Sequence, residues 1–140
     1  MHDKLDLHTH TIASIHAYST LTEMIQAAAN RGLELFGCSD HGPAMPGSLG
    51  GQYFINFKVI PRELFGVRIL MGAELNILDP SGAIDLSEQT LAKLDYTVAS
   101  IHGPCYSGKT VSENTSAYLG AIENPYVRII GHPDDGRFPL

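Results

Sequence analysis

The stretch Ile69-Leu70-Met71-Gly72-Ala73-Glu74-Leu75-Asn76-Ile77 is an apolar run with a carboxylate in its middle. Such a run is typical of a strand that is buried on both faces of a parallel sheet. An ionised side chain is costly to bury alone, so Glu74 should be paired, protonated or bound to a cation. A salt bridge to a nearby arginine such as Arg68 is one explanation. A carboxylate that bridges two metal ions, one through each oxygen, is the other.

Other short apolar runs on both sides of this stretch alternate with helical patterns. Thr20-x-x-Glu23 has the form of a capping box at a helix start, and Gly32 stands where that helix should end. The stretch 42–51 is rich in glycine and proline and indicates a long loop. We expect strands at 4–8, 33–38, 67–75, 96–100 and 127–130, and helices at 20–32, 87–93 and 112–124.

A polar residue with metal-binding chemistry closes each predicted strand. These residues recur about every thirty positions, which is the length of one strand and its crossover helix. In a parallel β/α architecture the carboxyl ends of all strands face one side, where loops form the active site. The repeat therefore predicts an α/β fold that brings distant residues into one cluster. The repeated residues are His10, His41, Glu74, His102 and His132.

Each candidate ligand has an ordinary explanation when it is taken alone. His8 and His10 would share one face of a strand and start a divalent metal site, but a two-histidine pair is a weak signal. A loop histidine such as His16 is usually solvated, and His102 could be a hydrogen-bonded core residue. The joint pattern is stronger, because all histidines except His2 lie at or just after predicted strand ends.

Composition excludes several classes of protein. The chain has 140 residues, 44% of them hydrophobic, so one domain with a buried core is expected. Its net charge of −6 argues against a broad surface for nucleic acid or anionic membranes, since both need clustered lysine and arginine. No apolar run reaches membrane-span length, and the first residues do not resemble a secretory signal. Cys38 and Cys105 are too few for a disulfide framework, which favours a buried strand thiol and a loop thiol in the cytoplasm.

Six short segments in a fixed order make the pattern specific along the whole chain. They are Asp6-Leu7-His8-Thr9-His10, His16-Ala17-Tyr18-Ser19, Ser39-Asp40-His41-Gly42, Gly72-Ala73-Glu74, Ser100-Ile101-His102 and Gly131-His132-Pro133. With these segments the chain resembles the PHP (polymerase and histidinol phosphatase) domain phosphoesterases. It is most similar to the YcdX-like bacterial phosphatase branch of that family.

The resemblance implies a distorted (β/α)7 TIM-like barrel that holds up to three divalent ions. It also implies that Asp6 and Asp40 orient imidazoles instead of binding metal directly. Its implied ligand sets are His8, His10 and Glu74 for one ion, Glu74, His102 and His132 for a second, and His16 and His41 for a third.

One part of the family pattern has no match here. The family completes its metal site with an Asp-x-His motif on a late strand, and nothing after His132 has that form. Asp134 or Asp135 could substitute, although a turn role suits both. A closed barrel typically needs about 250 residues. Residues 1–140 are therefore expected to be one domain, incomplete at its C-terminus and truncated after about five βα units of the barrel.

The resemblance predicts a metal-dependent phosphatase that hydrolyses small phosphorylated substrates. Water activated by the ions would attack phosphorus, with no side-chain nucleophile. Mixed histidine and carboxylate ligands suit Zn best, with Mn or Fe as alternatives. Lys109 and Arg137 are candidate phosphate contacts.

Two other functions remain open, and the pattern leaves the oligomeric state undetermined. One is an amidohydrolase-like metal enzyme, which also uses a paired histidine motif on its first strand. The other is a non-catalytic or inactive truncated module that keeps its histidines only to bind metal.

Overall fold

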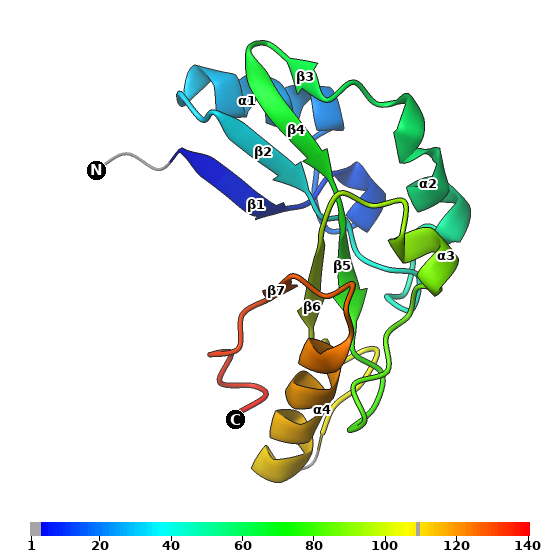
Figure 1. The fold of residues 1–140 in the computed structure, drawn as a ribbon. Helices are drawn as coiled ribbons and strands as arrows, with labels where there is room; N and C mark the ends of the chain where they lie inside the picture. Colours follow the sequence, from blue (N-terminus) through cyan, green and yellow to red (C-terminus); the bar gives the residue numbers. More distant parts are fainter. Residues whose placement is uncertain (1–3, 109) are drawn as a thin grey trace.

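The computed structural model describes residues 4–108 and 110–140, and it is a mixed α/β structure built on parallel strands (Figure 1). One sheet has the order β1-β2-β4-β3, and the other has the order β5-β6-β7. All neighbouring strands pair in parallel except β3 and β4, which are antiparallel. The strands are β1 (Leu5–Thr9), β2 (Leu35–Cys38), β3 (Glu63–Leu64), β4 (Val67–Met71), β5 (Ala73–Asn76), β6 (Thr97–Ser100) and β7 (Ile129–Ile130).

A single residue, Gly72, joins the two sheets between β4 and β5. The parallel ladder continues across it: the Gly72 N–H donates to the Cys38 carbonyl, and the Glu74 N–H donates to the Asp40 carbonyl. A side chain at position 72 would overlap Tyr96, so only glycine lets the strand bend there. The predicted strand 67–75 is thus confirmed, with a bend in its middle, and Glu74 lies inside β5 instead of closing a strand.

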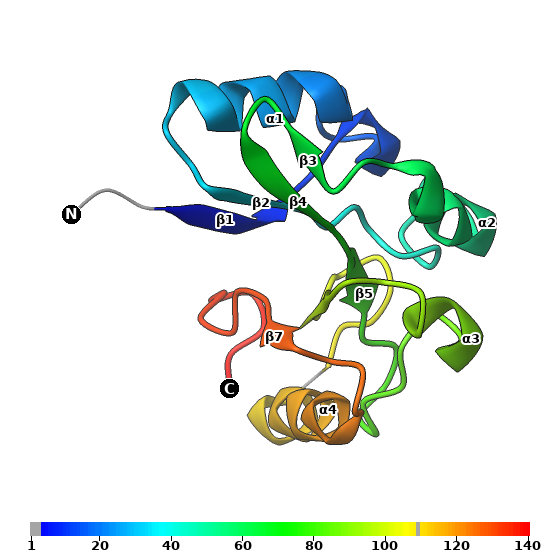
Figure 2. The same cartoon turned by 45° about the horizontal axis from the view of Figure 1, so that its top comes forward.

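The crossover helices lie around this bent wall of strands, with α1 and α4 on opposite sides of it in Figure 2. Thr20 and Glu23 form the predicted capping box of the first helix, and Gly32 has a φ of 76° after its end. A second capping box, of Thr110 and Glu113, starts the last helix. The helices are α1 (Leu21–Asn30), α2 (Gly51–Ile55), α3 (Glu88–Leu91) and α4 (Val111–Glu123), with 3-10 turns at Ile12–Ser14 and Asn56–Val59.

The segment before β4 contains a hairpin that the sequence pattern did not predict. β3 pairs with β4 across the two residues Phe65 and Gly66, whose φ angles are 54° and 77°. Two positive φ angles are what a type I′ turn requires, and asparagine or glycine usually provides them. Phe65 at the first position hides that signal.

The central strands are buried on both faces, as the apolar runs predicted. All residues of β5 and β6 are buried, and the helix α1 packs Ile25 and Ala28 into the same core. Cys38 is buried in β2, whereas Cys105 is partly exposed in a loop, and both thiols are free. In the described ranges, no helix has the length and apolar character of a membrane span.

Candidate metal centre

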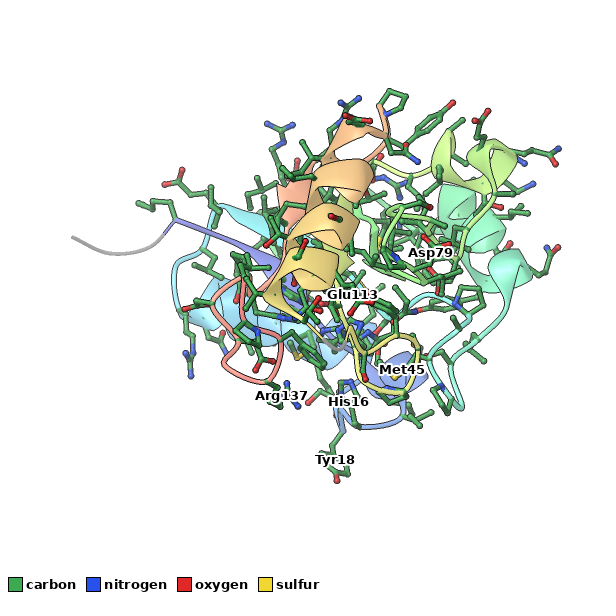
Figure 3. All side chains as sticks on the ribbon, turned by 90° about the horizontal axis from the view of Figure 1, so that it is seen from below. His16, Tyr18, Met45, Asp79, Glu113 and Arg137 are labelled. Atoms are coloured by element: carbon green, nitrogen blue, oxygen red, sulfur yellow. The ribbon has the colours of Figure 1, made fainter. Side chains whose placement is uncertain are left out.

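A pocket of about 330 Å³ opens where the strand ends meet. Figure 3 shows His16, Met45 and Arg137 on the same face of the molecule, while Tyr18 extends away from it. The pocket brings together every metal ligand that the sequence predicted. It is lined by His8, His10, His16, His41, Met45, Glu74, His102, Gly103, Pro104, His132, Arg137 and Phe138.

Five imidazoles surround the carboxylate of Glu74, whose side chain is only 1% exposed. Around Oε1 lie Nε2 of His8 at 3.0 Å, of His132 at 3.1 Å and of His102 at 3.3 Å. Around Oε2 lie Nε2 of His10 at 3.2 Å and Nδ1 of His41 at 3.1 Å. His41 Nδ1 is close to Oε2 but makes no hydrogen bond there.

The Oε1 atom has more neighbours than it can accept hydrogen bonds from. The hydroxyl of Ser100 donates to it at 2.7 Å, in addition to the three imidazole nitrogens. A carboxylate oxygen has only two lone pairs, so the hydroxyl and all three imidazole nitrogens cannot donate to it at once. Ligand atoms crowd in this way when a cation lies between them. The residues therefore fit a divalent ion, whose nitrogen and oxygen ligands lie about 2.0–2.2 Å from the metal.

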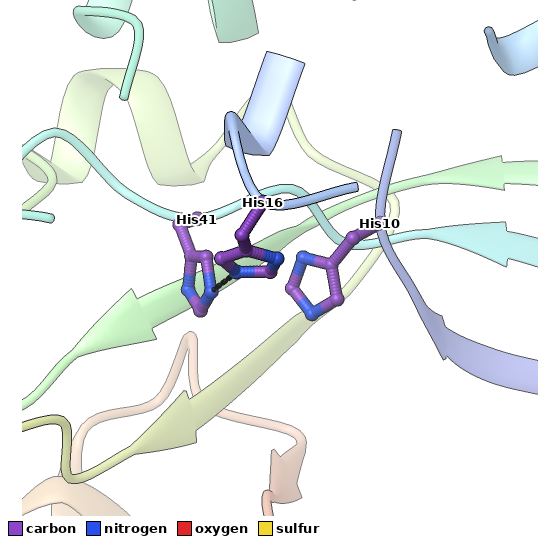
Figure 4. Close-up of side chains that lie close together, drawn as sticks. All are labelled: His10, His16 and His41. Carbon is purple, nitrogen blue, oxygen red and sulfur yellow. Dashed lines mark hydrogen bonds between the residues drawn. The ribbon is translucent and has the colours of Figure 1, made fainter. Parts of the chain in front are cut away.

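A second group of imidazoles shares His10 and His41 with the first and adds His16. Figure 4 shows these three rings together. His10, His16 and His41 offer ligand atoms within 4.8 Å of one another, and Nε2 of His41 lies 2.7 Å from Nε2 of His16. The remaining groups are His8, Glu74 and His132, and His41, Glu74 and His102.

The ligand grouping differs from the partition that the family resemblance implied. His10 joins the His16 and His41 group, while it still contacts Glu74, and His8 is grouped with His132 instead of His10. Glu74 belongs to two groups, as a bridging carboxylate would.

Close backbone approach positions the last imidazoles. Tyr118 on α4 donates its hydroxyl to the Gly131 carbonyl and accepts from the Ile101 N–H, which holds the ends of β6 and β7 together. A Cβ on Gly131 would collide with the Ser100 hydroxyl and press on the ring of His8. Glycine therefore allows β7 to reach the cluster.

Burial and mutual contact shift the pKa values of the site. Burial alone would raise the pKa of Glu74, but the contacts with His10, His102, His132 and His8 outweigh it and hold the pKa far below its usual range. Burial lowers the pKa of His41 to about 3. For His132, the contact with Glu74 raises the pKa of the imidazole. The carboxylate is therefore charged and His41 is neutral near neutral pH.

The two aspartates predicted to orient imidazoles have different surroundings. Asp40 is buried and accepts hydrogen bonds from Thr11, Tyr53 and Ser14, and Ser14 in turn contacts His10 Nδ1 at 3.1 Å. Asp6 requires a correction. It was predicted to orient an imidazole, but it lies on the outer side of β1, beside a separate hollow near α1. There its carboxylate accepts the backbone N–H of His8.

Other predictions about charged residues have mixed outcomes. Arg137 does line the pocket, with its guanidinium 2.6 Å from Asp135. Hydrogen bonds from Arg137 lower the pKa of Asp135 to about 2. Asp135 is thus paired with Arg137 and does not line the pocket, although its charge contributes to the raised pKa of His132. The proposed Arg68 partner for Glu74 is wrong, because Arg68 is exposed on β4, and Lys109 lies outside the described residues.

Sequence reasoning missed several polar residues around the imidazoles. Asn76 places Oδ1 2.8 Å from His102 Nδ1, and its amide nitrogen contacts Asp85 at 2.5 Å. Ser14 and Ser100 are fully buried beside the cluster. Asn76 follows Glu74 by two positions in a strand, so their shared side of the sheet was a usable signal. Ser14 and Asp85 had no comparable signal, because a short 3-10 turn brings Ser14 to the site and an irregular loop brings Asp85 there.

Comparison with known proteins agrees with this geometry. Residues 6–135 match the model of the PHP domain. The chain is 50% identical over 136 residues to a protein of Acetivibrio thermocellus and 51% identical over 137 residues to one of Caldanaerobacter subterraneus, each named a probable phosphatase. The matches cover 97% of this chain but 56% and 54% of those relatives, so the chain spans about half their length.

The matched region contains every imidazole of the pocket and the carboxylate at its centre. Because the match covers nearly the whole chain and includes these pocket residues, this protein belongs to the PHP domain family.

Proposed function

We propose that this chain forms the metal-binding part of a phosphatase that hydrolyses phosphate monoesters of small molecules. The observation that carries the proposal is the crowding at Glu74 Oε1, where three imidazole nitrogens and a hydroxyl surround one oxygen. Membership of the PHP family and relatives named probable phosphatases support the choice of phosphate chemistry.

The ligand set indicates which metal would suit the pocket. Histidine nitrogens with a shared carboxylate favour Zn, with Mn or Fe as alternatives. The ligands would be His8, His10, His16, His41, Glu74, His102 and His132. When bound, such ions neutralise phosphate charge and lower the pKa of water, so that no side-chain nucleophile is required.

Residues at the rim would bind and orient the substrate. Among the described residues that line the pocket, Arg137 is the one with a permanent positive charge, and a guanidinium suits the oxygens of a phosphate group. Met45, Pro104 and Phe138 line the rest of the opening and would shield the reacting centre from bulk water. Because the net charge is −6, an anionic substrate requires local positive charge, which the bound ions and Arg137 would supply together.

The fold suggests how the site is enclosed. We propose that the bent order β1-β2-β4/β5-β6-β7 is the front portion of a (β/α)7 barrel, because each parallel strand lies beside the next parallel strand along the chain, with the antiparallel β3 outside this series. The predicted absence of a nucleic-acid surface and the cytoplasmic location stay predictions.

Metal removal and substitution in the full-length protein test the proposal. Protein incubated with zinc and freed of unbound metal should retain zinc by elemental analysis and should hydrolyse p-nitrophenyl phosphate. Removal of the zinc with a chelator should abolish that activity. His8→Ala and His132→Ala should each reduce kcat/KM by more than about 100-fold, because each removes a ligand instead of a supporting contact. An exposed substitution, Tyr18→Phe, is the control. A metal-loaded protein that cleaves a cyclic amide but no phosphate ester would contradict the proposal in favour of an amidohydrolase. One that cleaves neither would favour a non-catalytic module.

Arg137 gives a separate prediction about substrate binding. Arg137→Ala should raise KM for a phosphate ester about 10-fold, since one charged hydrogen bond contributes about 1.5 kcal/mol or more. Asp135→Asn should lower KM, because it releases the guanidinium from its present partner. Arg68→Ala, on the exposed side of β4, should leave KM unchanged. An unchanged KM in Arg137→Ala would exclude a phosphate contact.

A further inference from the structure

We infer that two hydrogen-bonded relays, Asp40–Ser14–His10 and Asp85–Asn76–His102, position the imidazoles by fixing which ring nitrogen carries the proton. The inference deepens the proposed function, because it assigns positioning residues to the proposed metal ligands. Ser14, Asn76 and Asp85 act through the histidines and do not themselves reach the centre of the pocket.

The first relay is determined by the single proton of the Ser14 hydroxyl. Ser14 Oγ lies 2.7 Å from Asp40 Oδ1, and that oxygen also accepts the Thr11 N–H at 2.7 Å. The carboxylate can only accept, so the hydroxyl donates to it. The backbone N–H of His41 donates to Ser14 Oγ at 3.1 Å. The remaining lone pair faces His10 Nδ1 at 3.1 Å, so His10 must carry its proton on Nδ1.

The second relay is determined by the orientation of the Asn76 amide. Its Nδ2 contacts the Gly42 carbonyl at 3.1 Å and Asp85 Oδ2 at 2.5 Å, and both partners are acceptors. These contacts place the NH2 group on that side and leave Oδ1 facing His102 Nδ1 at 2.8 Å. His102 must then carry its proton on Nδ1 as well.

Asp85 is itself held firmly. It accepts the backbone N–H groups of Asn76 and Ala44, each at 2.9 Å. Gly42 packs against the carboxylate so closely that a Cβ there would overlap it. The loop that begins at Gly42, the strand β5 and the imidazole of His102 are therefore joined through one carboxylate.

The relays have a common consequence at the centre of the pocket. A neutral imidazole with its proton on Nδ1 has a lone pair on Nε2. Nε2 of His10 lies 3.2 Å from Glu74 Oε2, and Nε2 of His102 lies 3.3 Å from Oε1. Each Nε2 can therefore face its carboxylate oxygen only with a second proton, as in an imidazolium, or with a cation between the two atoms. A divalent ion would take the place of those second protons.

The test uses four variants of the full-length protein. Ser14→Ala and Asn76→Ala each break one relay. Ser39→Ala and Asn114→Ala remove a buried serine and a buried asparagine that bond to backbone carbonyls, of Thr9 and Pro139, instead of imidazoles. Each protein is compared by thermal unfolding, by zinc affinity in competition with a chelator, and by imidazole nitrogen NMR without metal.

The NMR measurement separates a relay from a general loss of packing. In the metal-free protein we expect His10 and His102 to show protons on Nδ1. Asn76→Ala should move the proton of His102 to Nε2 and leave His10 unchanged, and Ser14→Ala should do the reverse. Each of these variants should also lose about 10- to 100-fold in zinc affinity, whereas the control variants keep it.

Failure of the inference can be distinguished from failure of the proposed function. Nδ1 protons that persist in both relay variants, or wild-type zinc affinity in both, would overturn the relays. A wild-type protein that binds zinc but cleaves no phosphate ester would refute the proposed function and leave the tautomer result standing. A wild-type protein with protons on Nε2 of His10 and His102 would overturn the relays even if the enzyme is active.

Discussion

Glu74→Gln should weaken stabilisation by zinc and make the metal-free protein less stable than the wild type. The glutamine keeps the shape of the side chain but removes the buried charge whose contacts with the imidazoles hold the pKa of Glu74 far below its usual range. We expect the metal-free variant to lose about 1–3 kcal/mol in free energy of unfolding, the scale of hydrogen bonds to a charged group. In the wild type, zinc at 100 times its dissociation constant should add about 2.7 kcal/mol, and in the variant clearly less, because the carboxylate shared by two ligand groups is gone.

Thermal unfolding of both proteins, with and without zinc, measures the loss of metal-free stability and the weaker response to zinc. Glu88→Gln removes the same charge from the exposed start of α3 and should change neither the metal-free stability nor the response to zinc. Equal stabilisation of the wild type and the Glu74→Gln variant by zinc would show that the carboxylate is not a ligand. Activity toward p-nitrophenyl phosphate should fall with the zinc response.

Gly120→Ala should destabilise the protein by about 2 kcal/mol, within the range of overpacked cores. Glycine in a helix usually costs about 1 kcal/mol relative to alanine, so the same change on an open helix surface would stabilise. Here α4 passes so close to the 79–82 turn that a Cβ on Gly120 would overlap the Ser81 carbonyl. The steric cost should therefore exceed the gain in helix propensity and reverse the sign.

Urea unfolding measures the change in free energy of unfolding that the contact between α4 and the 79–82 turn should cause. Gly136→Ala is the matched control, because a Cβ there meets nothing within 4 Å and its φ is ordinary. We expect the control to lie within about 0.5 kcal/mol of the wild type. If Gly120→Ala proved as stable as the control, the turn and α4 would not be in close contact in solution.

The sequence predicted the pocket because its residues follow a regular rule. Parallel strands that succeed one another along the chain place their carboxyl ends side by side, so spacing alone brought His10, His41, His102 and His132 together. Glu74 followed from the cost of burying a carboxylate in an apolar run. The hydrophobic pattern also predicted the parallel strands and the helices α1, α3 and α4, apart from their boundaries and the bend at Gly72, but it did not predict α2.

The parts that the sequence could not predict depend on details of register and loop conformation. The β3–β4 hairpin was missed because Phe65 occupies a left-handed position that asparagine or glycine usually fills. The contact of Asp85 with Asn76 depends on how an irregular loop folds back onto β5. Asp6 was misplaced because the pairing of β1 with β2 is irregular between Asp6 and Thr9. A pattern of residue types does not encode such a shift.

The assembly of the pocket from separate strand ends has a consequence for its formation during synthesis. His10, His16 and His41 belong to the first two strand ends, whereas His132 lies 58 residues beyond Glu74. These three residues are therefore synthesised before Glu74, but His41 pairs with Glu74 and reaches its place only when β5 is added. Three imidazoles without the carboxylate would favour copper over zinc, whereas the shared carboxylate adds the oxygen ligand of a mixed site. The bridge between His41 and Glu74 thus makes the geometry of the nitrogen cluster dependent on the strand that supplies the oxygen.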